Sequence, residues 1–331
     1  MNVSVVVATY NRGPLLRRLI DDLERQSLSS ERFDVTVVDD GSKEPAATIL
    51  DGMRPRFRFK VERQENQGPG AARDRGVKLS KHPLVVFIDD DMELPADFLE
   101  AHLAAIDGGL TVVQGLIAPD PGLSRMPIFE RFHADQLERF VHSVENGTAT
   151  VRGVDLCTGN LGMLRRAYEG VGGFDKTLGR SEDRELGVRL ETAGEKLGLS
   201  ARAKTTHRSD HASLEVWRKR AFNYGVYDHR IAKKHQAVEA ADPWRFWFMV
   251  NPVSRPLLLT AASVPAAGKR LADASIHAAM ALDRLGATRL AIAGTTLCYG
   301  LEYFRGVRED SGSLAECARD FVRYLGKRKK A

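Results

Sequence analysis

The 331-residue sequence predicts an α/β fold, a doubly wound, mostly parallel sheet flanked by helices, followed by a helical C-terminal extension. Apolar, β-branched runs alternate with segments of helical periodicity along the N-terminal part of the chain. Strand signals stop near residue 215, and the charge changes there. Residues 218–331 hold 20 Lys and Arg against 10 Asp and Glu, a net of +10, so the total of +5 leaves −5 for the first 217 residues. We therefore expect one domain over 1–215 and a basic, amphipathic helical region over 216–331.

The predicted elements of the first domain follow one another in strand–helix order. They are strands over 3–8, 33–38, 57–62 and 84–88, and helices over 14–26 and about 71–79. In sheets of this type, ligands bind at the edge where the carboxyl ends of the strands meet. If the first, second and fourth strands are neighbours, the polar loops that follow them share one site.

The acidic run Asp89-Asp90-Asp91 directly follows the fourth predicted strand. Three adjacent carboxylates repel one another unless a cation or solvent relieves them. Hard oxygen ligands of this kind suit Mg²⁺ or Mn²⁺ bound together with substrate phosphates. The alternative is a helix N-cap, because a helical pattern begins at Pro95. We favour a site for a divalent metal and a diphosphate.

Two other loops suggest a nucleotide. Asp39-Asp40-Gly41-Ser42 is either a simple turn or a base contact, in which Asp39 accepts a hydrogen bond from a ring N–H such as that of uracil. Gly68-Pro69-Gly70 opens a helix whose N-terminus favours anions, and Arg73 either contacts phosphate or only solvates the helix surface. The loop after the first strand lacks the glycine fingerprint of a dinucleotide site, which argues against hydride transfer.

Together these segments closely resemble the signature series of family 2 inverting glycosyltransferases, which have the GT-A fold. The resemblance runs from residue 3 to about residue 230, and the segments that carry it are Val5–Arg12, Val37–Ser42, Asn66–Gly68 with Arg73, and Phe87–Asp91. It implies that a sugar passes from a nucleoside diphosphate donor, UDP more than GDP or dTDP, to a hydroxyl group. The acceptor would be a growing glycan, a lipid-linked saccharide or a secondary metabolite.

The resemblance also implies roles for the matching residues. Asp90 would approach the ribose, Asp91 would coordinate Mn²⁺ or Mg²⁺, and Asp89 would support the strand end or the ribose. The residues that would hold the nucleotide and its metal are Thr9, Tyr10, Arg12, Asp39, Gly68, Arg73, Asp89, Asp90 and Asp91.

Two later segments resemble the acceptor side of the family's site. The segment 158–163, with Gly159 and Asn160, resembles the strand that enters this side, and Glu182-Asp183 resembles the segment that carries the catalytic base. An inverting transfer needs one carboxylate to take a proton from the acceptor hydroxyl. We assign Asp183 as that base and Glu182 as an orienting residue, although the two roles are exchangeable. The alternative is that the acidic pair only caps a helix that starts at Ser181.

A histidine is the second expected metal ligand, because family members often supply one after a strand such as the segment predicted over 198–206. His207 and His211 are both candidates here. We favour His207 because it lies nearer the predicted strand end.

The C-terminal region is basic and rich in aromatic residues, with a predicted helix over 217–234, an aromatic segment over 242–250 and two or three further helices. Its longest uncharged stretches, 256–268 and 290–301, have 13 and 12 residues, too few to cross a bilayer. We expect it to contact an anionic membrane surface, the catalytic domain or a second copy. No nucleic-acid-binding module accompanies it, so we do not expect nucleic acid as a partner.

From the remaining features we expect a cytoplasmic protein that is peripheral on the inner face of the membrane. Three widely spaced cysteines form neither a disulfide framework nor a metal knuckle, and the sequence opens on a strand instead of a signal peptide. Two alternative functions stay open. A sugar-phosphate nucleotidyltransferase would need a glycine-rich, basic loop after the first strand, and a non-catalytic scaffold on the membrane surface would not need Asp183.

Overall fold

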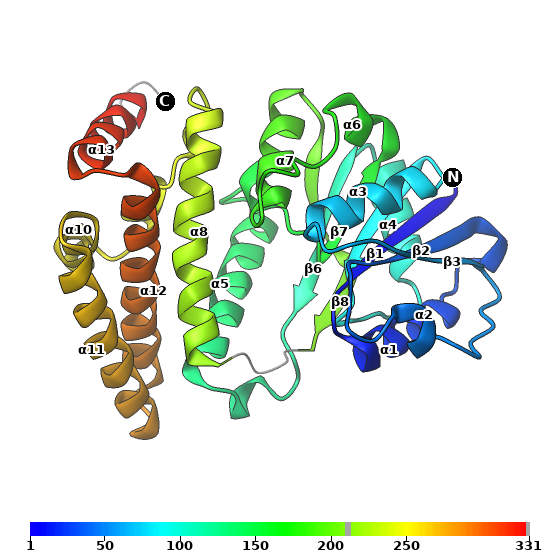
Figure 1. The fold of residues 1–331 in the computed structure, drawn as a ribbon, viewed down its shortest axis with the longest axis horizontal. Helices are drawn as coiled ribbons and strands as arrows, with labels where there is room; N and C mark the ends of the chain where they lie inside the picture. Colours follow the sequence, from blue (N-terminus) through cyan, green and yellow to red (C-terminus); the bar gives the residue numbers. More distant parts are fainter. Residues whose placement is uncertain (209–212, 329–331) are drawn as a thin grey trace. The chain divides into compact units, whose positions relative to one another are not determined.

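The computed structural model describes residues 1–208 and 213–328, which form two compact units (Figure 1). Among the described residues, the first unit comprises 1–120 and 137–208, and the second comprises 121–136 and 213–328. The second unit therefore takes one segment from well before residue 216. The assignment of catalysis to residues 1–215 and of membrane or partner contacts to 216–331 stays a prediction.

In the described part of the first unit, an eight-stranded sheet has the order β3-β2-β1-β4-β7-β6-β8-β5. Neighbours pair in parallel from β3 to β4 and again between β6 and β8, whereas β7 and β5 run antiparallel to their neighbours. The strands are β1 (Val3–Thr9), β2 (Phe33–Asp39), β3 (Arg58–Arg63), β4 (Leu84–Asp89), β5 (Met92–Glu93), β6 (Val112–Ala118), β7 (Asn160–Leu164) and β8 (Leu197–His207). The predicted mostly parallel sheet is confirmed, and the first, second and fourth strands are neighbours.

Helices flank this sheet (Figure 1). Helix α3 packs against β1 and β2, and α4 packs against β6, β7 and β8. The helices are α1 (Gly13–Glu24), α2 (Ala46–Ile49), α3 (Pro69–Leu79), α4 (Phe98–Asp107), α6 (Arg165–Gly170) and α7 (Glu182–Thr192), with 3₁₀ turns at Ser30–Arg32 and Gly153–Asp155; α5 (Ile128–Glu145) has residues in both units.

Both faces of the central strands are buried. In β4, Val86 and Ile88 belong to one apolar cluster, while Val85 and Phe87 belong to another. Because successive side chains of a strand point to opposite faces, the unbroken apolar run fills both cores and leaves its polar residues at the strand end. This burial fixes the position of the acidic run.

The second unit is helical and has its own core. It contains α8 (Leu214–Lys234), α9 (Arg245–Met249), α10 (Arg255–Ser263), α11 (Pro265–Arg284), α12 (Thr288–Ser311) and α13 (Leu314–Arg328), with 3₁₀ turns at Leu123–Arg125, Glu239–Ala241 and Pro252–Ser254. The prediction of two or three helices after the aromatic segment was wrong, because four are described. Gly286 and Gly312, both with positive φ, follow the ends of α11 and α12, and Pro265 begins α11.

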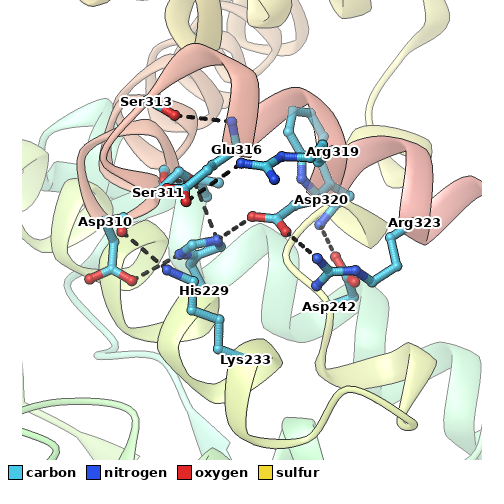
Figure 2. A network of polar contacts seen from close by, with 12 residues as sticks. His229, Lys233, Asp242, Asp310, Ser311, Ser313, Glu316, Arg319, Asp320 and Arg323 are labelled. Atoms are coloured by element: carbon cyan, nitrogen blue, oxygen red, sulfur yellow. Dashed lines mark hydrogen bonds and ion pairs between the residues drawn. The ribbon is translucent and has the colours of Figure 1, made fainter.

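A polar network joins three of these helices. Figure 2 shows His229 of α8 between two carboxylates, with its Nδ1 2.8 Å from Asp310 of α12 and its Nε2 2.9 Å from Asp320 of α13. The imidazole is almost fully buried. None of the described helices is long and apolar enough to cross a membrane.

Candidate active site

The ends of β1, β2 and β4 bring the predicted loops together. The parallel register pairs Thr9 with Asp39 and Ala8 with Asp89. The carboxyl ends of the three strands therefore lie side by side at one edge of the sheet, as the sequence predicted.

Asp90 is the most enclosed member of the acidic run. Its Oδ2 accepts a hydrogen bond of 2.7 Å from the hydroxyl of Thr9, and its Oδ1 lies 3.5 Å from the guanidinium of Arg12. Burial raises the pKa of Asp90 to about 7, because the hydrogen bond from Thr9 and the charge of Arg12 do not offset the loss of solvent and the like charges of Asp91 and Asp89. Asp90 therefore links the acidic run to the loop after β1.

Asp91 has the features of a metal ligand. Its Oδ2 accepts a hydrogen bond from Arg12 and lies 3.3 Å from Nε2 of His207, whereas its buried Oδ1 accepts no hydrogen bond from any described residue. Burial raises the pKa of Asp91, but the hydrogen bonds and positive charges of His207 and Arg12 outweigh it and hold the pKa below its ordinary value. Asp91 is thus an ionised carboxylate with a buried oxygen that lacks a protein partner.

This arrangement fits a divalent cation with substrate ligands. A carboxylate and an imidazole suit Mn²⁺ or Mg²⁺, which commonly complete their coordination with substrate phosphates and water. The described residues contain no group of three or more His, Cys, Asp or Glu side chains able to hold a metal by themselves. His207 is the last residue of β8 and pairs with Met92 of β5, which brings it to Asp91. His211, the other candidate, lies outside the described residues.

Arg73 is a buried bridge between two carboxylates. It donates hydrogen bonds of 2.7 Å to Glu182 and 2.7 Å to Asp89. Burial opposes its charge, but Asp89, Glu182 and Asp183 raise the pKa of Arg73 above its ordinary value. The alternative that Arg73 only solvates the helix surface was wrong, because the buried guanidinium ties α3 to β4 and α7. Phosphate contact stays a prediction.

Asp183 lies in the first turn of α7 and is half-buried. Its Oδ1 accepts a hydrogen bond of 2.8 Å from the backbone N–H of Arg184, and its Oδ2 lies 3.4 Å from the N–H of Thr158. Ser181, the N-cap residue of α7, has a φ of 60° and makes no side-chain cap. Helix capping therefore accounts for one oxygen of Asp183, while the other faces the loop before β7.

Glu182 points into the interior beside Asp183. Burial and the negative charge of Asp183 raise the pKa of Glu182, and Arg73 opposes that rise. Close packing fixes this helix, because a Cβ at Gly187 would lie 2.0 Å from the carbonyl oxygen of Gly153. The two acidic neighbours thus differ in environment, with Glu182 paired in the interior and Asp183 nearer solvent.

Asp39 stabilises a turn. Its oxygens accept hydrogen bonds from the N–H groups of Ser42 at 2.8 Å and Ala46 at 3.0 Å, and Arg63 lies 3.3 Å away. Burial raises the pKa of Asp39, but these hydrogen bonds and Arg63 lower it below the ordinary value. The turn interpretation therefore holds for Asp39, and contact with a base stays a prediction. Tyr10 is exposed.

The motifs predict no separate role for Asp40, which nonetheless organises the loop before α3. Its Oδ1 accepts hydrogen bonds from the side chain of Gln64 at 2.8 Å and from the N–H of Gln67 at 2.9 Å, and its Oδ2 accepts one of 2.9 Å from Gly68. Gly68, the N-cap of α3, has a φ of 90°, which favours glycine. Asp40 therefore holds the loop that leads into α3. The only feature of the sequence that pointed to this role was the position of Asp40 next to Asp39 in the acidic turn.

Gly159 and Asn160 have different surroundings. A Cβ at Gly159 would lie 3.3 Å from Oδ2 of Asp89, so this glycine borders the acidic run. Asn160 is fully buried, and its amide donates to the carbonyls of Ala203 at 2.8 Å and Leu116 at 3.1 Å. The side chain of Asn160 thus holds strands of the sheet together, and its acceptor-side role stays a prediction.

His102 completes this buried network and was not predicted. Its Nε2 lies 2.9 Å from Oδ1 of Asn160, and burial lowers its pKa to about 4. No motif marked it, because only the pairing of β7 between β4 and β6 brings Asn160 to α4.

Comparison with known proteins identifies the family. The sequence matches the model of glycosyl transferase family 2 over residues 4–172. A validoxylamine A glucosyltransferase of Streptomyces hygroscopicus subsp. jinggangensis (strain 5008) is 29% identical over 282 residues, covering 75% of this chain and 64% of the relative. The chain thus spans less than two thirds of that relative's length.

Solved structures share the fold. The mannosyltransferase PcManGT from Pyrobaculum calidifontis, in complex with GDP-Man and Mn²⁺, aligns with a TM-score of 0.60 at 17% identity, covering 97% of this chain and 87% of that one. S. aureus TarS 1-349 in complex with UDP-GlcNAc aligns with a TM-score of 0.51 at 19% identity. This alignment covers 93% of this chain and 91% of that one. The predicted GT-A type fold is confirmed. Because the family model covers half of the sequence, from β1 to the end of α6, the chain belongs to glycosyl transferase family 2.

Proposed function

We propose that the protein transfers a sugar from a nucleoside diphosphate sugar, most readily a UDP-sugar, to a hydroxyl acceptor with inversion of the anomeric centre. The observation that carries the proposal is Asp91, whose buried Oδ1 has no partner among the described residues while His207 lies 3.3 Å from its other oxygen. Such a pair suits a divalent metal that also binds a diphosphate. The family membership argues against a sugar-phosphate nucleotidyltransferase.

Asp183 is the proposed general base. As the acceptor oxygen attacks the anomeric carbon, its proton passes to a carboxylate oxygen of Asp183, and the bond from that carbon to the diphosphate oxygen breaks on the opposite side. The backbone N–H groups of Arg184 and Thr158 orient this carboxylate, and each oxygen keeps a lone pair. Glu182 is engaged by Arg73, which favours Asp183 over Glu182 for this role.

The donor would be held at the end of β1, β2 and β4. When bound, Mn²⁺ or Mg²⁺ supplies positive charge that stabilises the leaving diphosphate. Asp91 and His207 would be its protein ligands, and Arg12, which already donates to Asp91, would lie near the phosphates. The solved relatives with UDP-GlcNAc and with GDP-Man and Mn²⁺ support a nucleotide-sugar donor. UDP as the donor nucleotide and a cytoplasmic location stay predictions.

The test is nucleoside diphosphate release from a panel of UDP-, GDP- and dTDP-sugars, with Mn²⁺ or Mg²⁺ and with EDTA. We expect release that EDTA abolishes and that added Mn²⁺ restores. Turnover that is unaffected by EDTA would overturn the role of Asp91. Absence of turnover together with metal-dependent UDP binding would favour the non-catalytic scaffold.

A further inference from the structure

The guanidinium of Arg12 lies at the edge of the carboxylate of Asp91 where the proposed metal would bind. One of its nitrogens, Nη1, donates a hydrogen bond to Oδ2 of Asp91 and lies 3.5 Å from Oδ1 of Asp90. Nε2 of His207 lies 3.3 Å from the same Oδ2 of Asp91. A positively charged side chain therefore contacts two members of the acidic run, beside the imidazole that we propose as the second protein ligand.

The backbone that carries Arg12 is held, whereas its side chain reaches solvent. Asn11 has a φ of 59°, its N–H donates to the hydroxyl of Ser42 at 2.9 Å, and its Oδ1 accepts a hydrogen bond of 2.8 Å from the N–H of Lys43. The side chain of Arg12 is 32% exposed, against 7% for that of Asp91. The guanidinium can thus leave Asp91 by rotation of its own side chain, without a shift of the loop after β1.

The neighbouring arginine, Arg208, has other partners. Its backbone N–H donates to the carbonyl oxygen of Asp91 at 2.9 Å. Its guanidinium, however, lies 2.7 Å from Glu93 and 3.4 Å from Asp120. The arginine whose charge acts directly on the carboxylate of Asp91 is therefore Arg12.

A divalent cation and this guanidinium would compete for the same oxygen. A metal held by Asp91 and His207 would lie close to the charge of Arg12, and the two cations would repel each other. A diphosphate changes this balance, because its oxygens bind the metal and also offer the guanidinium a bidentate partner. The charge of Arg12 would thus oppose the metal alone and favour the metal together with a diphosphate.

We propose that Arg12 couples the binding of the metal to the binding of the nucleoside diphosphate. It holds Asp91 against a metal that arrives without the nucleotide, and it passes to the diphosphate oxygens when metal and nucleotide bind together. This coupling rests on the metal-dependent donor site proposed above, and it makes metal and nucleotide bind as a pair. If Arg12 only oriented Asp91, its removal would weaken the binding of metal, whereas the coupling predicts the opposite sign.

Binding of Mn²⁺ to the full chain, measured by electron paramagnetic resonance of the free ion, tests this coupling. The measurement is made at pH 8, because Asp90, with a pKa of about 7, is largely ionised there. We expect the wild type to bind Mn²⁺ about tenfold more tightly with saturating UDP than without it. Arg12→Gln should bind Mn²⁺ alone roughly tenfold more tightly than the wild type does, because the repelling charge is gone, and UDP should then add less. Arg12→Lys keeps the charge and should retain the weak binding of Mn²⁺ alone.

Arg17→Gln is the matched control. Arg17 lies in α1 and donates to the carbonyl oxygen of Ile49 at 2.9 Å on the exposed surface, so its variant should bind Mn²⁺ as the wild type does. Thermal unfolding checks that every variant is folded. An Arg12→Gln variant that binds Mn²⁺ alone no more tightly than the wild type would overturn the coupling, as would an equal gain in Arg17→Gln. Wild-type protein that binds no Mn²⁺ even with UDP would overturn the proposed metal site as well.

Discussion

At the scale of single residues, the site depends on buried charges that neutralise one another. Arg73, almost fully buried, joins Glu182 to Asp89, and Asp89 in turn borders Gly159. Removing one partner of a buried ionic network leaves the other charges without compensation. The arginine therefore supports both the stability of the site and the orientation of the carboxylates around Asp183.

Replacement of Arg73 by glutamine should destabilise the protein strongly. We expect the free energy of unfolding to fall by about 3 kcal/mol or more, because Glu182 keeps its burial and loses its counter-charge. Arg75→Gln is the matched control, since Arg75 lies two residues along the same helix, is half exposed and pairs with Glu62 at the surface. Urea unfolding of both variants measures the difference. Equal effects would contradict a buried bridge at Arg73.

His102 should make stability depend on pH. Its pKa is about 4 in the folded protein, against an ordinary value near 6.5. Between these values the unfolded chain binds a proton that the folded chain does not, so the free energy of unfolding falls as the pH falls from 6.5 to 4, by about 3 kcal/mol at most. His102→Gln should remove this part of the dependence. Unfolding curves at several pH values measure it, and unchanged slopes in the variant would contradict the assignment.

Motifs in the sequence indicate the chemistry of a residue, but they do not indicate which side chains it contacts in the fold. Asp91 and His207 were expected to bind metal because their segments resemble those of the family, and this role stays a prediction. The surroundings of Asn160 and Arg73 depend on strand pairing and on burial, which local spacing does not encode. The motif therefore did not indicate that the amide of Asn160 bonds to main-chain carbonyls of β6 and β8.

At the scale of elements, the second unit depends on a close helix crossing. A Cβ at Gly225 of α8 would lie 1.9 Å from the carbonyl oxygen of Tyr303, and one at Gly306 of α12 would lie 2.0 Å from that of Phe222. Glycines on both helices thus allow the two backbones to approach closely.

The order of the strands was easier to predict from the sequence than this helix crossing. Alternating strands and helices restrict the connections that a parallel sheet can make.

Alanine at either crossing position should force α8 and α12 apart. We expect Gly306→Ala to lower the free energy of unfolding by roughly 1–3 kcal/mol, the usual cost of overpacking. Gly326→Ala on α13 is the matched control, because a Cβ there meets no atom within 4 Å, and alanine favours a helix more than glycine does. Thermal unfolding of both variants measures the effect. A Gly306→Ala variant as stable as the wild type would contradict the close crossing.

At the scale of the whole molecule, the chain combines a family 2 glycosyltransferase fold with a basic helical unit. The strand signals and the charge change near the same residue, and the sequence therefore predicts a division there. It did not predict that 121–136 belongs with the second unit, since packing partners so far apart in the chain leave no local pattern. The aromatic segment was visible in the sequence, but its burial in a core was not.

The most direct test of the central claim compares donor binding with sugar transfer in Asp183→Asn and Asp91→Asn. Calorimetric titration with the preferred nucleotide sugar and Mn²⁺ gives Kd, and nucleoside diphosphate release in the presence of acceptor gives the rate. We predict that Asp183→Asn binds donor like the wild type but transfers about 10²–10⁴-fold more slowly, whereas Asp91→Asn loses the Mn²⁺-dependent part of donor binding. An Asp183→Asn variant that transfers at the wild-type rate, or an Asp91→Asn variant with unchanged Mn²⁺-dependent binding, would contradict the account.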